Sequence, residues 1–137
     1  MNVTRFWLML FLCTVTVAVV GCGGDGIERV GVSGTVSYQG QPVQEGMISF
    51  EPQGQGTPAG AIIKGGKYDA TGTGAVPVGR YRVRISATVE DTANWVKDAM
   101  PVAPKKELLP AKYNRDTELT LEVASGAGEM EQNYDLK

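Results

Sequence analysis

Two patterns of hydrophobic residues divide this chain of 137 residues. The first is an almost unbroken apolar run over residues 6–20, and the second is an alternation of apolar and polar residues that begins near Val30. Alternation with a period of two is typical of half-buried β-strands, and no stretch keeps a helical period for three turns. The pattern therefore predicts an all-β domain over residues 30–137.

The alternation predicts seven strands separated by turns rich in glycine and proline. In the first, residues 30–38, the apolar side chains share one face and Gly34 takes the place of one of them. The others are expected at residues 47–51, 59–64, 67–71, 80–87, 118–123 and 130–136. Seven short antiparallel strands in about 110 residues favour a two-sheet β-sandwich, with an insertion between strands at about residues 90–107.

The apolar run near the amino end follows one positive charge, Arg5, and ends in Gly21-Cys22-Gly23-Gly24. A bilayer-spanning helix needs about 20 apolar residues, whereas this run is shorter and contains two threonines. A charged region followed by a short apolar region is typical of a secretory signal peptide. Residues 1–21 are therefore expected to be an export signal.

Cys22 lies at the exit of this segment. The junction Val19-Val20-Gly21-Cys22 resembles the bacterial lipobox, which predicts a diacylglyceryl group on Cys22 and cleavage between Gly21 and Cys22. Acyl chains contribute about 0.8 kcal/mol per buried CH₂, so two or three chains make a lasting membrane anchor. The alternative is an ordinary cleaved signal followed by a chance cysteine.

Cleavage would leave a mildly acidic chain. Cys13 would be lost with the signal, so no disulfide is expected in the mature protein. The mature chain would carry 12 basic and 15 acidic residues, a formal charge of −3, without a basic cluster for nucleic acid. Residues 22–29 contain three glycines and no apolar periodicity, so they are expected to be a flexible tether between lipid and domain.

Several short motifs mark the predicted turns and strands. They are Gly34-Thr35-Val36, Gly40-Gln41-Pro42-Val43, Gly46-Met47-Ile48-Ser49-Phe50, Gly66-Lys67-Tyr68, Pro77-Val78-Gly79-Arg80-Tyr81-Arg82-Val83, Leu109-Pro110-Ala111-Lys112-Tyr113-Asn114 and Leu119-Thr120-Leu121-Glu122-Val123. Together they resemble the motifs of carboxypeptidase regulatory-like domains. The resemblance covers most of the mature chain. In this respect the chain is similar to short bacterial lipoproteins that consist of one such domain. The resemblance implies a transthyretin-like sandwich and a non-catalytic role as a stabilising or adhesive module, while the insertion departs from the family pattern.

Catalytic constellations are missing from the sequence. The chain has no histidine, which excludes His-activated nucleophiles and His-containing metal sites. It also separates the chain from the transthyretin-like hydrolases of a purine catabolite, which rely on histidines. Glu90, Asp91 and Asp98 form a loop cluster of carboxylates that solvation explains, and residues 69–74 lack the oxygen ligands of a calcium loop. We expect no catalytic residue, no metal and no cofactor.

Arg80, Arg82 and Arg84 would line one exposed strand face. Such a stripe could grip sulfate, phosphate or carboxylate groups of a glycan. The alternative is a ladder against the polar face of the strand at residues 118–123, where each opposed pair contributes roughly 0.2–1 kcal/mol. The ladder is favoured, because matched charges on two strands need no ligand.

Two aromatic residues are the remaining candidates for contact with a ligand or partner. Trp95 lies in an unusually apolar insertion, and Tyr113 follows it. They could stack on sugar rings or anchor a protein partner. The favoured alternatives are that Trp95 folds back as a lid on the sandwich edge and that Tyr113 packs at a sheet corner.

Two functions from different classes follow from these observations. One is a structural or protein-interaction module at the cell envelope, attached to the membrane through Cys22, with an envelope protein or glycan as partner. The other is a small carbohydrate-binding lipoprotein that uses aromatic residues of the 90–113 region. In both cases the protein would be exported and lipid-anchored, with the outer membrane preferred over the inner.

Overall fold

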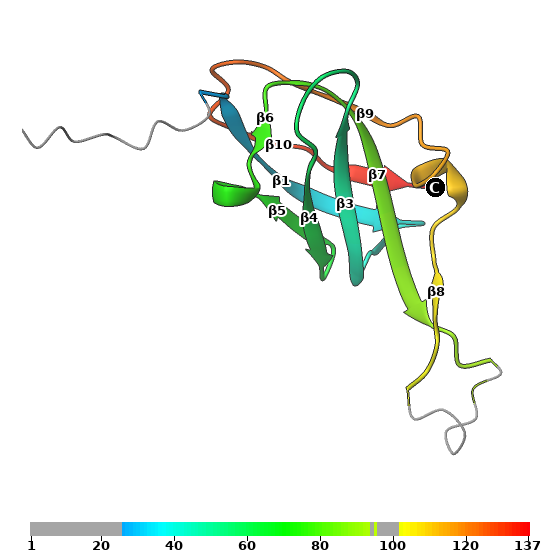
Figure 1. Ribbon diagram of the computed structural model, residues 1–137. Coiled ribbons are helices and arrows are strands. Elements are labelled where there is room, and N and C mark those ends of the chain that lie inside the picture. The colour runs from blue at the N-terminus through cyan, green and yellow to red at the C-terminus, as the bar shows by residue number, and fades with distance from the viewer. Residues whose placement is uncertain (1–25, 94, 96–101) are drawn as a thin grey trace, which may run out of the picture.

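The computed structural model describes residues 26–93, 95 and 102–137 (Figure 1). The expected signal peptide, the cleavage and lipidation residues Gly21 and Cys22, and the centre of the predicted insertion lie outside the described residues.

Strands make up most of the described chain, as the alternation of apolar and polar residues predicts. They are β1 (Arg29–Tyr38), β2 (Gln41–Pro42), β3 (Glu45–Pro52), β4 (Ala59–Lys64), β5 (Lys67–Ala70), β6 (Val76–Pro77), β7 (Gly79–Glu90), β8 (Lys105–Glu107), β9 (Thr120–Val123), β10 (Glu129–Glu131) and β11 (Tyr134–Leu136). Two short 3₁₀ turns, η1 (Gly72–Gly74) and η2 (Ala111–Tyr113), are the helical elements of this part of the chain. Within it, no helix has the length and apolarity to cross a bilayer.

The strands pair in one continuous curled sheet that forms a half-barrel. Its order is β10-β1-β5-β4-β3-β7-β8, with β9 also paired to β7, and β2, β6 and β11 paired to β1. The sheet curls so that β1 and its neighbours face β3 and β7 (Figure 1). The all-β prediction is therefore confirmed, while the described strands form a single hydrogen-bonded path where two sheets were expected.

The carboxyl-terminal segment corrects one prediction. Residues 130–136 were expected to form one antiparallel strand, but β10 and β11 are separate, and both run parallel to β1. The interruption falls at Gln132 and Asn133, whose polar groups bond elsewhere. The N–H of Gln132 donates to the Ser33 carbonyl at 2.8 Å, and the Asn133 side chain accepts from the Thr35 N–H at 2.7 Å.

The hairpin between β4 and β5 has the predicted turn at Gly65-Gly66. Both glycines have positive φ, 55° and 77°, as a two-residue hairpin turn of type I′ requires. The turn places Lys64 directly opposite Lys67 and Ile63 opposite Tyr68. It therefore sets the register that puts Ile63 and Tyr68 in the core.

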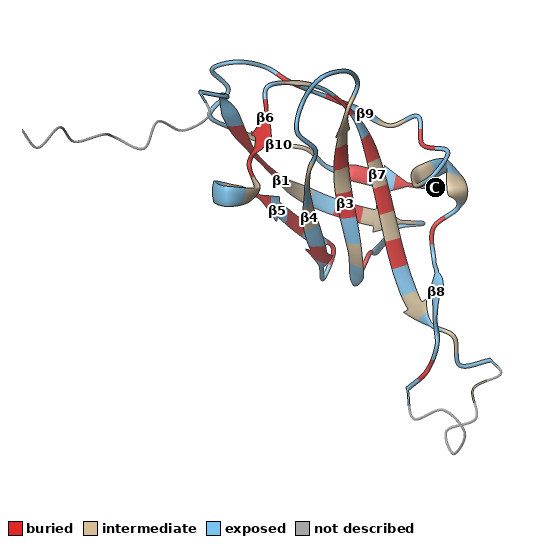
Figure 2. Ribbon diagram, in the orientation of Figure 1, coloured by how far each residue is buried: buried red, intermediate tan, exposed pale blue. Residues whose placement is uncertain are grey.

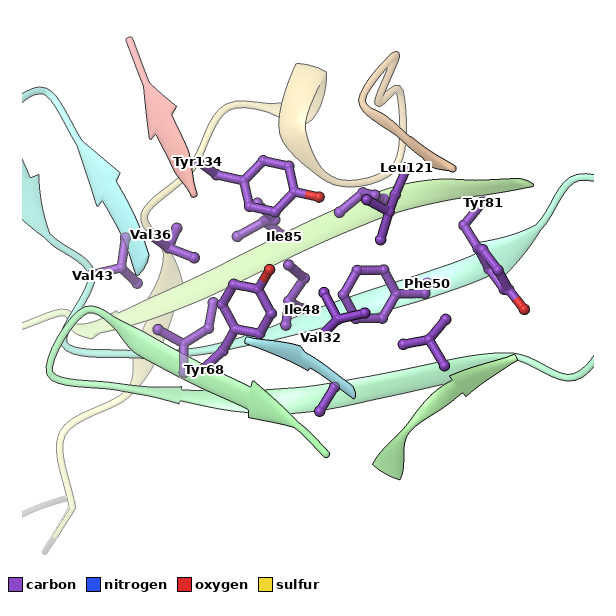
Figure 3. Close-up of a cluster of buried hydrophobic side chains, with 14 of the residues drawn as sticks. Val32, Val36, Val43, Ile48, Phe50, Tyr68, Tyr81, Ile85, Leu121 and Tyr134 are labelled. Carbon is purple, nitrogen blue, oxygen red and sulfur yellow. The ribbon is translucent and has the colours of Figure 1, made fainter. Parts of the chain in front are cut away.

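The core lies between the two curled halves of the sheet, and alternation along the strands fills it. Buried residues alternate with half-buried or exposed ones along the central parts of β3 and β7 (Figure 2). The buried side chains come from every major strand, and Figure 3 shows several of them converging. The ring of Phe50 lies 6.3 Å from that of Tyr68 and 6.5 Å from that of Tyr81, and Tyr68 lies 6.4 Å from Tyr134. Each such aromatic pair adds about 0.5–1.5 kcal/mol beyond the burial of its surface.

The flanks of the predicted insertion form a two-stranded ribbon. β7 runs past the predicted end of its strand to Glu90, and β8 pairs with it through Thr88, Val89 and Glu90. We call residues 88–90 and 105–107 the β7–β8 ribbon, and in Figure 1 it extends away from the body of the sheet. The Glu107 carboxylate fixes its base by accepting hydrogen bonds from the N–H groups of Ala87, at 2.8 Å, and Leu109, at 3.2 Å.

Candidate functional site

The three predicted arginines lie on the outer face of β7, and the expected ladder is present in part. Arg80 stands opposite Glu122 on β9, and its Nε lies 3.5 Å from Glu122 Oε2. Arg82 stands opposite Thr120 of β9. Arg84 turns to the other neighbouring strand, where its Nη1 lies 2.7 Å from Glu51 Oε1 on β3. The ladder therefore uses both neighbours of β7, whereas only one was predicted.

These ion pairs differ in exposure. The side chains of Arg80 and Glu122 are 74% and 69% exposed, and those of Arg84 and Glu51 are 42% and 41% exposed. Exposed pairs contribute only about 0–1 kcal/mol, so the ladder does little for stability. Its chemical effect is that Glu122 and Glu51 offset the positive charge of Arg80 and Arg84.

The observed contacts of Tyr113 are with other residues of the domain. Its hydroxyl accepts a hydrogen bond from the Lys137 N–H at 2.8 Å and donates one to the Lys137 carbonyl at 2.5 Å. Its ring packs edge-on against Tyr38 with centroids 6.5 Å apart. Tyr113 thus joins η2 to the residue after β11 and to the end of β1, as expected of a tyrosine at a sheet corner.

Trp95 is half-buried, and its backbone N–H donates to the Thr92 carbonyl at 3.4 Å. It is not one of the residues of the main core that the structure describes. Tyr113 is likewise half-buried, with its ring edge-on to Tyr38.

An exposed apolar pair was missed in the sequence. Met47 on β3 stands opposite Ile62 on β4, and these side chains are 54% and 61% exposed. They border an open, shallow hollow of 610 Å³ on the outer face of the sheet, together with Ser86, Thr88 and Lys64. The signal was available, because Met47 falls on the polar face of its predicted strand, where an apolar side chain is out of pattern.

Among the described residues, two buried tyrosines, Tyr68 and Tyr134, have strongly raised pKa values. Tyr134 is 7% exposed, and its hydroxyl has no hydrogen-bond partner among the described residues. The Tyr68 hydroxyl beside it donates to the Gln132 carbonyl at 2.7 Å. Burial raises the pKa of Tyr134 to about 12, and burial together with the nearby Tyr134 and Glu131 raises the pKa of Tyr68 further. Both phenols are therefore neutral over the physiological range.

The same substitution at Tyr134 and at Tyr68 is expected to have opposite effects on stability at neutral pH. Tyr134→Phe is expected to raise the free energy of unfolding by about 1 kcal/mol, because it removes a buried polar group that is not hydrogen-bonded. Tyr68→Phe is expected to lower it by about 1–2 kcal/mol, because it removes a hydrogen bond and leaves the Gln132 carbonyl without that donor. Urea unfolding at pH 7 measures both. A loss of stability in Tyr134→Phe equal to that in Tyr68→Phe would contradict the prediction.

The described residues hold no group of three or more Cys, Asp or Glu side chains arranged to bind a metal ion. Comparison of the chain with protein-family models, curated proteins and solved structures gives no match.

Proposed function

We propose that this protein is a lipid-anchored, non-catalytic module of the bacterial cell envelope with a structural or protein-interaction role. The observation that supports this proposal is that most of the candidate binding side chains make contacts with other residues of the same domain. Arg80 and Arg84 have carboxylate partners on adjacent strands, and Tyr113 holds the backbone of Lys137. The anchor comes from the lipobox-like residues 19–22.

The proposal includes a carboxypeptidase regulatory-like domain with a transthyretin-like sandwich. Two of the motifs that carry this resemblance have turn or core positions that support the proposal. Gly66-Lys67-Tyr68 follows the β4–β5 turn and buries its tyrosine. In Pro77-Val78-Gly79-Arg80-Tyr81 the tyrosine is buried, and its hydroxyl donates to the Pro77 carbonyl at 2.8 Å.

The carbohydrate-binding alternative receives less support. It depends on aromatic rings offered to a sugar face, and Tyr113 is half-buried with both hydrogen-bonding functions of its hydroxyl engaged by Lys137. The exposed pair Met47 and Ile62 is apolar without an aromatic ring, which suits a protein surface better than a sugar.

The anchor is tested by Cys22→Ala in cells that express the full chain, with Cys13→Ala as the matched control. Cys22→Ala is expected to abolish association with the membrane fraction, because the thiol that receives the lipid is gone. Cys13→Ala is expected to leave it unchanged, because that residue would be removed with the signal. Mass spectrometry of the amino-terminal peptide measures the modification. An unmodified, soluble mature chain in all three strains would overturn the proposal.

A further inference from the structure

The tether enters the domain at one fixed end. Glu28 anchors it there, since its carbonyl accepts from the Val78 N–H at 3.0 Å and its carboxylate accepts from the Ser125 hydroxyl and the Gly126 N–H. These contacts join the start of β1 to the segment before β7 and to the loop after β9. We call residues 26–29 and the loops 53–58, 71–75 and 124–128 the amino-terminal pole.

The three loops of the amino-terminal pole contain no Asp, Glu, Lys or Arg. They consist of Gly, Ala, Ser, Thr, Gln and Pro, although charged residues make up 20% of the whole chain. Two apolar side chains, Ile27 and Val78, are exposed beside them at 45% and 38%. The charges nearest these loops are Glu28, which is hydrogen-bonded to the 124–128 loop, Arg29, Glu129 opposite Gly31, and the ion pair of Arg80 with Glu122 at the start of β7.

The β7–β8 ribbon has the opposite character and lies at the other end of the molecule (Figure 1). Its exposed side chains include Glu90, Lys105, Lys106 and Glu107, with Lys105 paired to Glu45 at 3.1 Å and Lys106 to Asp91 at 3.5 Å. β7 itself connects the two ends. Lys106 of the ribbon stands opposite Val89 of β7, so at roughly 3.3 Å per residue it lies about 30 Å from Gly79, where β7 begins.

Distance and charge together decide how such a domain lies on a membrane. Only residues 22–25 separate the first described residue from the proposed lipid, and a fully extended chain covers at most about 3.5 Å per residue, or about 14 Å. Charges that come within about 8 Å of an anionic lipid surface are only partly screened, because that is the Debye length at physiological ionic strength. An acidic domain therefore approaches most easily with an uncharged face toward the lipid.

We infer that the domain stands with its amino-terminal pole against the lipid headgroups and holds the β7–β8 ribbon about 30 Å farther out. This inference rests on the proposed lipidation of Cys22. It assigns the lipid surface to the uncharged loops and leaves the charged ribbon facing the envelope space, where a protein partner would meet it.

Energy transfer from single labelled cysteines tests the orientation. The full lipoprotein is purified in detergent and added to vesicles of phosphatidylethanolamine and phosphatidylglycerol that carry an acceptor dye on a headgroup. A lipidated Cys22 has no free thiol, so a cysteine introduced by Ala127→Cys or Gln55→Cys marks the pole, and one introduced by Lys106→Cys marks the ribbon. All three positions are exposed. The same proteins in excess detergent without vesicles give the background.

We expect at least about twofold more efficient transfer from residues 127 and 55 than from residue 106, because β7 separates the two ends by about 30 Å. Equal transfer from vesicle-bound Ala127→Cys and Lys106→Cys, or more transfer from the ribbon, would overturn the orientation and leave the anchor standing. A parent chain whose Cys22 reacts with the dye and which does not bind vesicles would overturn the proposed function, and the orientation with it.

Discussion

Replacing Gly34 by alanine is expected to lower the free energy of unfolding by about 3 kcal/mol or more, among the largest effects of any single methyl addition to this chain. An alanine Cβ there would lie 1.9 Å from the Gln132 carbonyl oxygen and 2.7 Å from its carbon. These are backbone atoms, and they are fastened in place. The Gln132 N–H donates to Ser33, and the Gln132 carbonyl accepts from the Tyr68 hydroxyl.

Gly31→Ala is the matched control, because it adds the same methyl group to the same strand. Its Cβ would lie 3.0 Å from Thr71 Cγ2 and 3.3 Å from Glu129 Cγ, both side-chain atoms that can move. Its cost is therefore expected to stay within about 1 kcal/mol. Urea or thermal unfolding of both variants measures the difference. Equal losses of stability would mean that the backbone at Gln132 can shift away from β1 at little cost, so that position 34 does not require a glycine.

Gly34 also shows where sequence reasoning stops. The alternation of apolar residues in β1 marks position 34 as a gap on the core-facing side, and the absence of a side chain there is visible in the sequence. The reason for the gap lies 98 residues away, where Gln132 and Asn133 cross over β1. Nothing in the local pattern around Gly34 shows that segment, because contacts so distant in sequence depend on the topology of the sheet.

The carboxyl-terminal strand was misjudged for a related reason. Met130, Tyr134 and Leu136 alternate with polar residues, and the strand period is correctly predicted from them, since Tyr134 and Leu136 are buried. The direction of pairing leaves no mark on that alternation, because side chains alternate in parallel and antiparallel strands alike. The parallel pairing of β10 and β11 with β1 therefore had to come from the structure.

For the candidate site, the sequence predicts which face of the strand the arginines occupy but not which residues they contact. The arginine stripe and its outward face follow from the period of β7, and the exposure of its ion pairs bears this out. Which acid meets which arginine depends on the registers of β3 and β9 with β7, and the alternation along β7 does not reveal these registers. Arg84 consequently pairs with Glu51, a partner 33 residues away.

Alkaline pH is expected to unfold the domain through its buried tyrosines. The pKa of Tyr134 rises from 10 to about 12 on burial, and that of Tyr68 rises further. Below pH 10 both phenols are neutral in the folded and the unfolded chain, so their ionisation does not affect stability. Above pH 10 the unfolded chain releases these protons and the folded chain does not. Each tyrosine then lowers the free energy of unfolding by about 1.4 kcal/mol per pH unit, or roughly 2–3 kcal/mol for Tyr134 by pH 12.

Tyr134→Phe isolates this contribution, because lysines and arginines titrate alike in the variant and the parent chain. The free energy of unfolding of Tyr134→Phe is expected to exceed that of the parent chain by about 1 kcal/mol from pH 7 to about pH 10. The difference is then expected to widen by roughly 2 kcal/mol toward pH 12, because only the parent chain is destabilised by the ionisation of Tyr134 in its unfolded state. Urea unfolding of the two chains at pH 7, 9, 10 and 11 follows the difference. An advantage that does not grow above pH 10 would mean that the Tyr134 phenol ionises as easily in the folded chain as in the unfolded one. The hydroxyl would then have to reach solvent through the open side of the half-barrel, and the core would be less closed there than the packing of Tyr68 against Tyr134 indicates.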